Sequence, residues 1–308
     1  MRAAVTTERG VAPVLAEFPI PQAREGAVLI DVATAGLGGW DVLGAYRLGV
    51  QYPCVIRGEG VGHTLEGRRV YFGERSVAPF GAWAERTVVP VDEVWDVPDH
   101  VDDKTAITMG IAGTGALVPL ETAGVKKGDN VLILGATGTL GQIALQLARI
   151  MGAGRVVGAA RSAEALARLK QRGLADAVVC LGGDNDAEAL KAESNGGFDV
   201  VLDLVCGTPM LAALKATRWG ARIVTVGTGA GRMVNLDIAD LLFRTLSCVG
   251  TGQRSPADRR AIWERLLVMA KSDNIMVDYA DYRFDQAGQA WAAQVAGPHA
   301  KITASFAR

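Results

Sequence analysis

The chain has 308 residues, of which 49% are hydrophobic and 21% are charged, a balance typical of a folded globular protein. Its formal net charge is −1, and acidic and basic residues alternate without blocks, which argues against DNA or RNA as the main partner. A chain of this length exceeds what one hydrophobic core usually supports, so we expect two domains.

The cysteines and the N-terminal residues bear on the cellular compartment. Cys54, Cys180, Cys206 and Cys248 lie far apart, without the spacing of a zinc ribbon or a disulfide framework. Charged residues within the first ten positions argue against a secretory signal, and no apolar run reaches the length of a membrane span. We therefore expect a cytoplasmic protein without a membrane partner.

The first part of the chain predicts a compact, mainly antiparallel β domain. Strand-like segments at 28–36, 68–72 and 83–91 are short and are broken by Gly, Pro and charged turns. No helical periodicity is found before about Asp103. We assign residues 1–115 to this domain.

The middle of the chain alternates strand and helix patterns. Short apolar, β-branched runs predict six strands, at 130–134, 155–160, 177–181, 198–205, 221–227 and 246–251. Between the first strands, apolar residues recur at helical spacing from Leu140, and a second helix has Ser162 as its cap and Gly173 as its stop. Near-continuous apolar strands joined by helices are typical of a six-stranded, doubly wound Rossmann domain of the α/β class, which we assign to 116–252.

The last part of the chain predicts two helices and a strand. The first helix begins with Ser255 as its cap and Pro256 at its first position, and a second covers about 285–296. Residues 301–306 predict a final strand. We expect 253–308 to return to the first domain and complete it.

Three glycines between the first strand and the first helix of the Rossmann domain predict a dinucleotide site. Gly135 and Gly138 permit a tight turn and a close approach of the backbone to a pyrophosphate, and Gly141 lets the helix pack on the strand. The helix N-terminus offers unpaired N–H groups to phosphates. The alternative is a turn without a ligand.

The remaining cofactor contacts follow from the ends of the other strands. An NAD enzyme typically places an acid after the second strand, whereas this chain has Ala160, Arg161 and Ser162, with no acid before Glu164. Arg161 can pair with a 2′-phosphate and Ser162 can donate a hydrogen bond to it, so we predict NADPH; the alternative is that Arg161 only caps a surface turn. Further expected contacts, in the glycine loop and after the fifth and sixth strands, are Thr137, Thr139, Leu140, Gly227, Thr228, Gly250 and Thr251.

Several segments, in their order and spacing, resemble the medium-chain dehydrogenase/reductase superfamily over nearly the whole chain. They include VIRGEGVG (55–62), GAWAERTVVP (81–90), GALVPL (115–120) and VKKGDNVLILGATGTLGQIALQLARIMGA from residue 125. The resemblance implies a GroES-like, β-rich catalytic domain beside the Rossmann domain. It also implies a homodimer formed through the edge strands of the Rossmann sheets.

The chain departs from the zinc-dependent members of this superfamily. They carry a cysteine before the acid of the first motif, whereas the stretch from Leu37 to Asp41 has none; Gly58 replaces the histidine of their G-H-E motif, and the structural zinc lobe is missing. The three histidines are far apart, so no zinc ligand set is found. The chain therefore resembles the zinc-free quinone oxidoreductases and enone reductases. This resemblance implies reduction of an apolar quinone, or of an activated C=C bond, without a metal.

The candidate catalytic residues come from the segment with which this superfamily lines its cleft. Tyr46 or Tyr52 is expected to donate a hydrogen bond to the substrate oxygen, or each packs with its hydroxyl toward water. Asp41 either orients the backbone or relays a proton. Thr114 matches the superfamily threonine beside the nicotinamide, and Lys301 matches a lysine near the cofactor or is a solvated lysine.

Other readings of the chain stay open. The same scaffold supports a zinc-free ketoreductase or alcohol dehydrogenase, which needs a firmly placed proton donor because an alkoxide is a much stronger base than an enolate. A protein that binds NADPH with little turnover is the third reading. Trp40 and Trp263 either wall an apolar pocket or belong to the core.

Overall fold

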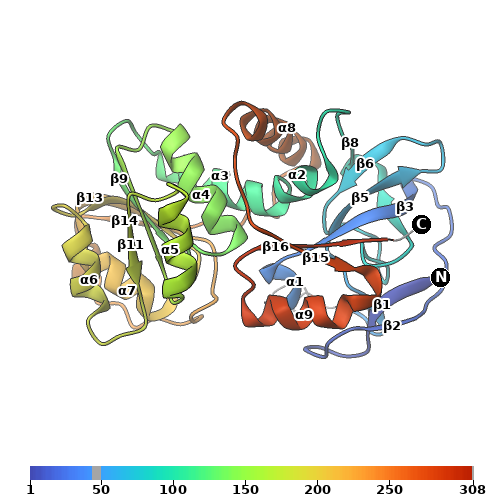
Figure 1. Ribbon diagram of the computed structural model, residues 1–308, viewed down its shortest axis with the longest axis horizontal. Coiled ribbons are helices and arrows are strands. Elements are labelled where there is room, and N and C mark those ends of the chain that lie inside the picture. Colours follow the sequence, from blue (N-terminus) through green and yellow to red (C-terminus); the bar gives the residue numbers. More distant parts are fainter. Residues whose placement is uncertain (44–49, 307–308) are drawn as a thin grey trace. The chain divides into compact units, whose positions relative to one another are not determined.

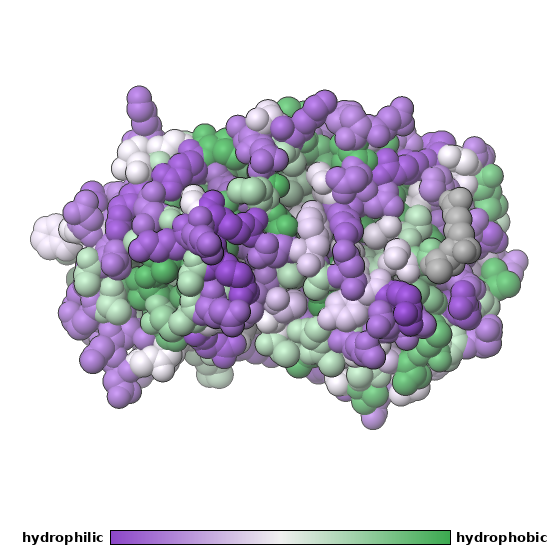
Figure 2. All heavy atoms as spheres, viewed as in Figure 1, coloured by the Kyte–Doolittle hydropathy of each residue, from purple (hydrophilic) through white to green (hydrophobic). Residues whose placement is uncertain are grey.

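The computed structural model describes residues 1–43 and 50–306. They form two compact units (Figure 1). The first unit comprises Met1–Ala112, Ser255–Ser272 and the segment from Asp278 onward, and the second comprises Gly113–Arg254 and Asp273–Val277. Hydrophilic side chains cover most of the face drawn in Figure 2, with smaller hydrophobic areas between them. Within the described residues no helix is long and apolar enough to cross a membrane.

The second unit is built on a six-stranded sheet in the order β11-β10-β9-β12-β13-β14, all pairs parallel. Its strands are β9 (Asn130–Leu134), β10 (Arg155–Ala160), β11 (Ala177–Cys180), β12 (Phe198–Asp203), β13 (Thr217–Thr225) and β14 (Thr245–Cys248). Its helices are α4 (Thr139–Ile150), α5 (Ala163–Gln171), α6 (Asp186–Glu193), α7 (Gly207–Lys215) and the short η3 (Ile238–Leu241). In Figure 1, α4 and α5 cover one face of the sheet, and α6 and α7 cover the other. The predicted doubly wound fold is confirmed.

Local chemistry explains the bounds of these elements. All five residues of β9 are buried, as expected for a strand covered on both faces. Ser162 caps α5 as predicted, since its hydroxyl accepts a hydrogen bond from the Ala165 amide. The fifth strand, β13, begins at Thr217 rather than at the expected 221, because Thr217 already pairs with Phe198 of β12; the register then shifts at an irregularity that includes Gly220, at a φ of 80°.

The first unit contains two sheets. The larger has the strand order β15-β16-β3-β5-β6-β8, with β7 paired to β3, and the smaller has the order β2-β1-β4. The strands are β1 (Arg2–Thr6), β2 (Val14–Glu17), β3 (Ala27–Leu37), β4 (Cys54–Val55), β5 (Glu59–Thr64), β6 (Arg69–Phe72), β7 (Arg86–Pro90), β8 (Val94–Asp96), β15 (Tyr279–Arg283) and β16 (Lys301–Ser305). Because β16 pairs antiparallel with β3, the last strand of the chain is part of this unit.

The helices of the first unit are α1 (Gly39–Leu43), α2 (Asp103–Thr108), α8 (Pro256–Ser272) and α9 (Ala287–Ala296), with the short η2 (Val91–Glu93) and η4 (Phe284–Gln286). Helix α3 (Ile111–Ala123) begins in the first unit and continues into the second. The helix α1 corrects the expectation that no helix precedes Asp103. With only five residues, α1 is too short to show helical periodicity in a sequence. The pair β15–β16 is parallel, whereas the other pairs of the first unit's sheets are antiparallel.

Candidate functional site

The glycine loop lies at the carboxyl end of β9 and leads into α4. Gly135 has a φ of 79°, which favours glycine, and a Cβ on Gly141 would lie 2.4 Å from the Gly135 carbonyl oxygen. Gly138 is the N-cap of α4 and makes no side-chain cap, so the first amides of the helix keep their hydrogen atoms available. Thr137 is buried, while Thr139 and Leu140 are half-buried. An anion can therefore bind to the loop amides and the helix dipole.

The carboxyl end of β10 carries a cation without a competing acid. Ala160 is buried, and Arg161 follows it on the surface. Within the residues that the structure describes, the Arg161 guanidinium takes part in no ion pair, whereas Arg168, on the helix α5 that follows, pairs with Glu164 at 2.7 Å. The Ser162 hydroxyl accepts from the Ala165 amide, so its own proton is free to be donated. These residues offer a charge and a donor to a phosphate.

The ends of β12, β13 and β14 lie at the same edge of the sheet as the glycine loop, because all the strands are parallel. Gly227 follows β13, and a Cβ on it would lie 2.0 Å from the Leu204 carbonyl oxygen. Thr228 is exposed beside Gly227, while Gly250 and Thr251 follow β14 with nothing within 4 Å of a Cβ on Gly250. The residues expected to bind a dinucleotide in this unit are thus brought to one edge, and their geometry fits such a ligand.

A buried carboxylate holds this edge together. Asp203, the last residue of β12, is fully buried and accepts hydrogen bonds from the Val205 and Cys206 amides at 3.0 and 2.8 Å. The Thr225 hydroxyl donates to it from β13 at 3.0 Å. Asp203 therefore fixes the turn after β12 and is structural.

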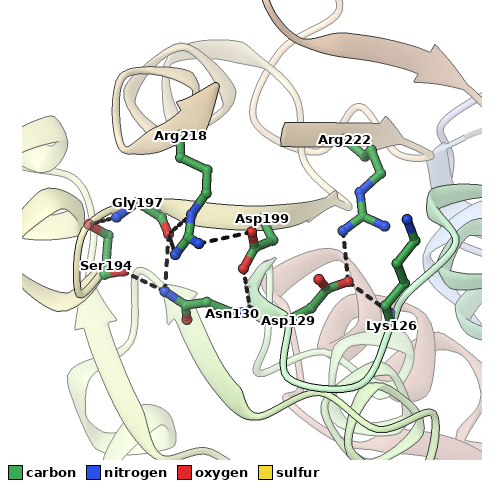
Figure 3. Close-up of polar contacts among 8 residues, drawn as sticks. All are labelled: Lys126, Asp129, Asn130, Ser194, Gly197, Asp199, Arg218 and Arg222. Carbon is green, nitrogen blue, oxygen red and sulfur yellow. Dashed lines mark hydrogen bonds and ion pairs between the residues drawn. The ribbon is translucent and has the colours of Figure 1, made fainter. Parts of the chain in front are cut away.

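The opposite edge of the sheet carries the polar cluster drawn in Figure 3. Arg222 donates to Asp129 at 2.7 Å, and Arg218 pairs with Asp199 at 3.2 Å. The Asn130 side chain donates to the Ser194 and Gly197 carbonyl oxygens. These groups lie at the amino ends of the strands and bind one another. We therefore interpret the cluster as structural, joining neighbouring strands and loops.

The polar interior of the first unit centres on Glu59, the first residue of β5. The Glu59 Oε1 atom accepts from Lys301 Nζ at 2.7 Å, and both side chains are 3% exposed. The Glu59 Oε2 atom accepts from the Tyr71 hydroxyl at 2.7 Å and from the Ile111 amide at 3.0 Å. The alternative of a solvated Lys301 is therefore wrong, because its ammonium group is enclosed beside a carboxylate.

Asp41 lies in the same interior and orients the backbone at Gly38 and Gly58. Its two carboxylate oxygens accept from the Gly38 amide at 2.8 Å and from the Gly58 amide at 3.1 Å. Burial raises the pKa of Asp41 from 3.8 to about 6, although the Gly38 amide and the Lys301 charge act in the opposite direction. This carboxyl thus holds two turns in place and takes up a proton just below neutral pH.

A second carboxyl titrates near neutral pH. Burial, with a further contribution from the Asp41 charge, raises the pKa of Glu74 from 4.5 to about 7. The Glu74 Oε2 atom is buried and has no hydrogen-bond partner among the described residues. Such an atom keeps a proton more readily than a solvated carboxylate does.

The remaining predicted residues are placed as follows. Tyr46 lies outside the described residues. Tyr52 packs on the core of the first unit with its hydroxyl oxygen buried, not turned toward water, and desolvation raises its pKa above the ordinary value. Thr114 is 7% exposed on α3. The pocket-wall reading of Trp263 is wrong, because its ring is buried and stacks on Tyr71, whereas Trp40 is exposed.

Comparisons with known proteins agree with this geometry. Residues 139–268 match the model of the zinc-binding dehydrogenase family. Quinone oxidoreductase-like protein 2 of Mus musculus is 27% identical over 259 residues, which cover 81% of this chain and 74% of the mouse protein. Prostaglandin reductase-3 of Bos taurus is 30% identical over 240 residues, which cover 75% of this chain and 61% of the bovine protein. A mycobacterial protein solved in complex with NADPH superposes with a TM-score of 0.88 at 24% identity, over 99% of this chain and all of that one.

The chain resembles the medium-chain dehydrogenase/reductase superfamily in its family match, its relatives and its fold. It is an oxidoreductase with a cofactor of the NAD(P) type. The superfamily includes zinc enzymes, but in the described part of this chain no three His, Cys, Asp or Glu side chains are grouped closely enough to hold a metal ion.

Sequence reasoning overlooked Glu59, Tyr71 and Glu74 as functional candidates. Glu59 was visible only as a member of the segment VIRGEGVG, and its partner Lys301 is 242 positions away. No local spacing connects such a pair. The one available signal was that an acid and a lysine each stood at the first position of a short strand.

Proposed function

We propose that the protein is an NADPH-dependent, zinc-independent reductase that transfers a hydride to a quinone or to the activated C=C bond of an enone or enal. The single observation that carries the cofactor choice is the Arg161 guanidinium after β10, which has no ion-pair partner among the described residues and stands where NAD enzymes of this fold place an acid. The names of the mouse and bovine relatives support the choice of substrate class.

In this proposal the second unit is the NADP-binding domain and the first unit is the catalytic domain. The Gly138 loop and the amides at the start of α4 hold the pyrophosphate. Arg161 would pair with the 2′-phosphate, and the Ser162 hydroxyl would donate a hydrogen bond to it. The residues after β13 and β14, Gly227 and Gly250 among them, leave room for the rest of the dinucleotide.

The chemistry then needs orientation and a place for negative charge. When bound, NADPH supplies a hydride from its nicotinamide C4. Thr114 contacts the nicotinamide, and Tyr46 or Tyr52 donates a hydrogen bond to the substrate oxygen on which charge develops. A tyrosine hydroxyl is protonated at neutral pH and is able to donate, and burial raises the pKa of Tyr52 further above that range. Asp41 holds the Gly38 and Gly58 turns of the catalytic domain in place.

Zinc independence rests on the residues that replace the ligands of the zinc-dependent members. Gly38 and Gly58 offer only backbone amides, and Asp41 already binds both of them. A metal would have to displace these hydrogen bonds, and among the described residues no three His, Cys, Asp or Glu side chains are grouped closely enough to bind it. We therefore propose that chelators leave the activity unchanged.

We further propose a homodimer formed through β14, the edge strand of the six-stranded sheet. Apolar side chains next to this edge are exposed, with Trp219 75% exposed and stacked on Phe243 at 4.9 Å. A second copy would cover them and pair the open edge. Light scattering should give twice the chain mass of 32.3 kDa.

Four cysteines without a disulfide favour a reducing, cytoplasmic location.

The cofactor choice is tested by Arg161→Ala, with Arg168→Ala, on the helix α5 that follows Arg161, as the control. Loss of a charge-assisted phosphate contact should weaken NADPH binding by about 1.5–3 kcal/mol, or roughly 10- to 150-fold, and leave NADH binding unchanged. Arg168→Ala should change neither affinity, because Arg168 pairs with Glu164. Isothermal titration with both cofactors measures the effect. Equal weakening of NADPH and NADH by Arg161→Ala would refute the assignment.

A further inference from the structure

Glu59 connects three distant parts of the first unit through one carboxylate. It receives a hydrogen bond from Lys301 on β16 through Oε1, and from Tyr71 on β6 and the Ile111 amide through Oε2. The approach to Ile111 is very close, since a Cβ on the preceding Gly110 would lie 2.5 Å from Glu59 Oε2 and 2.0 Å from the Tyr71 hydroxyl. Only glycine at position 110 lets the chain come this near to the carboxylate.

The Ile111 amide is the first one of α3. The first amides of a helix lack partners within the helix, and a carboxylate at this end also interacts favourably with the helix dipole. Glu59 supplies such a carboxylate from a buried strand, without water between the groups. The start of α3 is therefore fixed to the β5 strand rather than left to fray.

Thr114 stands three residues after Ile111 on this helix. At about 100° per residue and about 1.5 Å of rise, it lies almost one full turn further, about 4.5 Å along the axis. One residue later, Gly115 packs on Leu140 at the start of α4, where a Cβ would lie 2.7 Å from Leu140 Cδ1. The rotation and height of this turn are thus set by the contact of Ile111 at one end and by close packing at the other.

We propose that Glu59 is a positioning residue, which fixes the first turn of α3 and through it places Thr114 for hydride transfer. The inference rests on the proposed function, because Thr114 is assigned there to the nicotinamide. Lys301 has a supporting role: a carboxylate enclosed to this degree needs a paired positive charge, and Lys301 provides it. Tyr71 occupies the remaining acceptor capacity on Oε2.

The test separates two features of Glu59: the oxygen that accepts a hydrogen bond from the Ile111 amide, and the charge that pairs with Lys301. The triple variant Glu59→Met/Tyr71→Phe/Lys301→Met replaces the network by apolar side chains of similar volume, which proteins often tolerate without loss of stability. The double variant Glu59→Gln/Lys301→Met also removes both charges but keeps an amide oxygen for Ile111. A matched control, Glu93→Gln/Arg259→Met, neutralises another largely buried ion pair of the same unit.

Three readouts are compared: kcat, the Kd for NADPH and the exchange rate of the Ile111 amide. In the triple variant we expect kcat to fall by roughly 10- to 100-fold, as a small misplacement of a reacting geometry does, and the amide to exchange at least about tenfold faster. The Kd should stay within about twofold, because Arg161 and the glycine loop are untouched. The double variant and the control should stay within about threefold of the unmodified protein in all three.

Each other outcome overturns the inference. An unchanged kcat in the triple variant would show that Thr114 needs no anchor at Glu59. Equal losses in the triple and double variants would trace the effect to the charges, and parallel losses in Kd and kcat would indicate general disruption. If the unmodified protein turned over no acceptor, the proposed function would fail. The inference would then be decided by two other readouts, the exchange rate of the Ile111 amide and the nicotinamide fluorescence of bound NADPH. Both should change in the triple variant alone.

Discussion

Replacing Glu74 with glutamine should stabilise the protein relative to the unmodified protein, and this gain should be larger at high pH than at low pH. Glu74 is half-buried after β6, and its pKa is raised from 4.5 to about 7 by burial and by the Asp41 charge. In the folded protein this carboxyl therefore keeps its proton up to about pH 7, whereas in the unfolded chain it ionises near its ordinary value. Between these two values the folded state binds more protons, so the free energy of unfolding falls as the pH rises.

The magnitude follows from the two pKa values. At about 1.36 kcal/mol per pKa unit, a rise from 4.5 to about 7 costs about 3 kcal/mol of stability, absent at pH 4 and complete by pH 8. The Glu74→Gln variant lacks this titration and loses no hydrogen bond at Oε2, because that atom has no partner among the described residues. The difference in unfolding free energy, variant minus unmodified protein, should thus grow by about 3 kcal/mol from pH 4 to pH 8.

Urea unfolding followed by tryptophan fluorescence measures this difference. Five of the six tryptophans belong to the first unit, where Glu74 lies: Trp40, Trp83, Trp95, Trp263 and Trp291. Glu66→Gln is the control, because Glu66 is exposed in the same unit and its pKa is lowered rather than raised by its hydrogen bonds to Thr64 and its own amide. A difference for Glu74→Gln that stays constant across this pH range would refute the reasoning from burial.

Three further outcomes are expected. Gly141→Ala should lower the unfolding free energy by about 1–3 kcal/mol, because its Cβ would overlap the Gly135 carbonyl, while Gly138→Ala should have little effect on stability; equal losses in chemical denaturation would contradict the packing account. Tyr52→Phe should nearly abolish any ketone reduction but only reduce quinone reduction in steady-state assays; equal small losses would remove the distinction. Trp219→Glu should shift the mass in light scattering from dimer toward the 32.3 kDa monomer, and an unchanged dimer would move the interface elsewhere.

The Rossmann unit could be predicted from the sequence because its determinants are local. Strands buried on both faces are short apolar runs, and caps such as Ser162 stand next to the helices that they begin. The cofactor edge followed from the same reasoning, since parallel strands bring their carboxyl ends together. Arg161 could therefore be proposed as a phosphate ligand without a structure.

The interior of the catalytic unit could not be predicted in this way, because its contacts join residues far apart in the chain. Glu59 meets Lys301 across 242 positions, and Asp41 meets Gly58 across a turn that no periodicity marks. Trp263, which a sequence can place equally well in a pocket or in a core, stacks on Tyr71 from a helix almost 200 residues later. Such pairs depend on the tertiary fold and not on local spacing.

The most direct test of the account is steady-state oxidation of NADPH, with NADH in parallel and EDTA present. The acceptors are 1,4-benzoquinone, 9,10-phenanthrenequinone, a 2-alkenal, a cyclic enone and simple ketones. The account predicts turnover of quinones or enones with NADPH that EDTA does not affect. Turnover of ketones alone would make the protein a ketoreductase, loss of activity with EDTA would contradict zinc independence, and tight NADPH binding without any turnover would make it a binding protein instead of an enzyme.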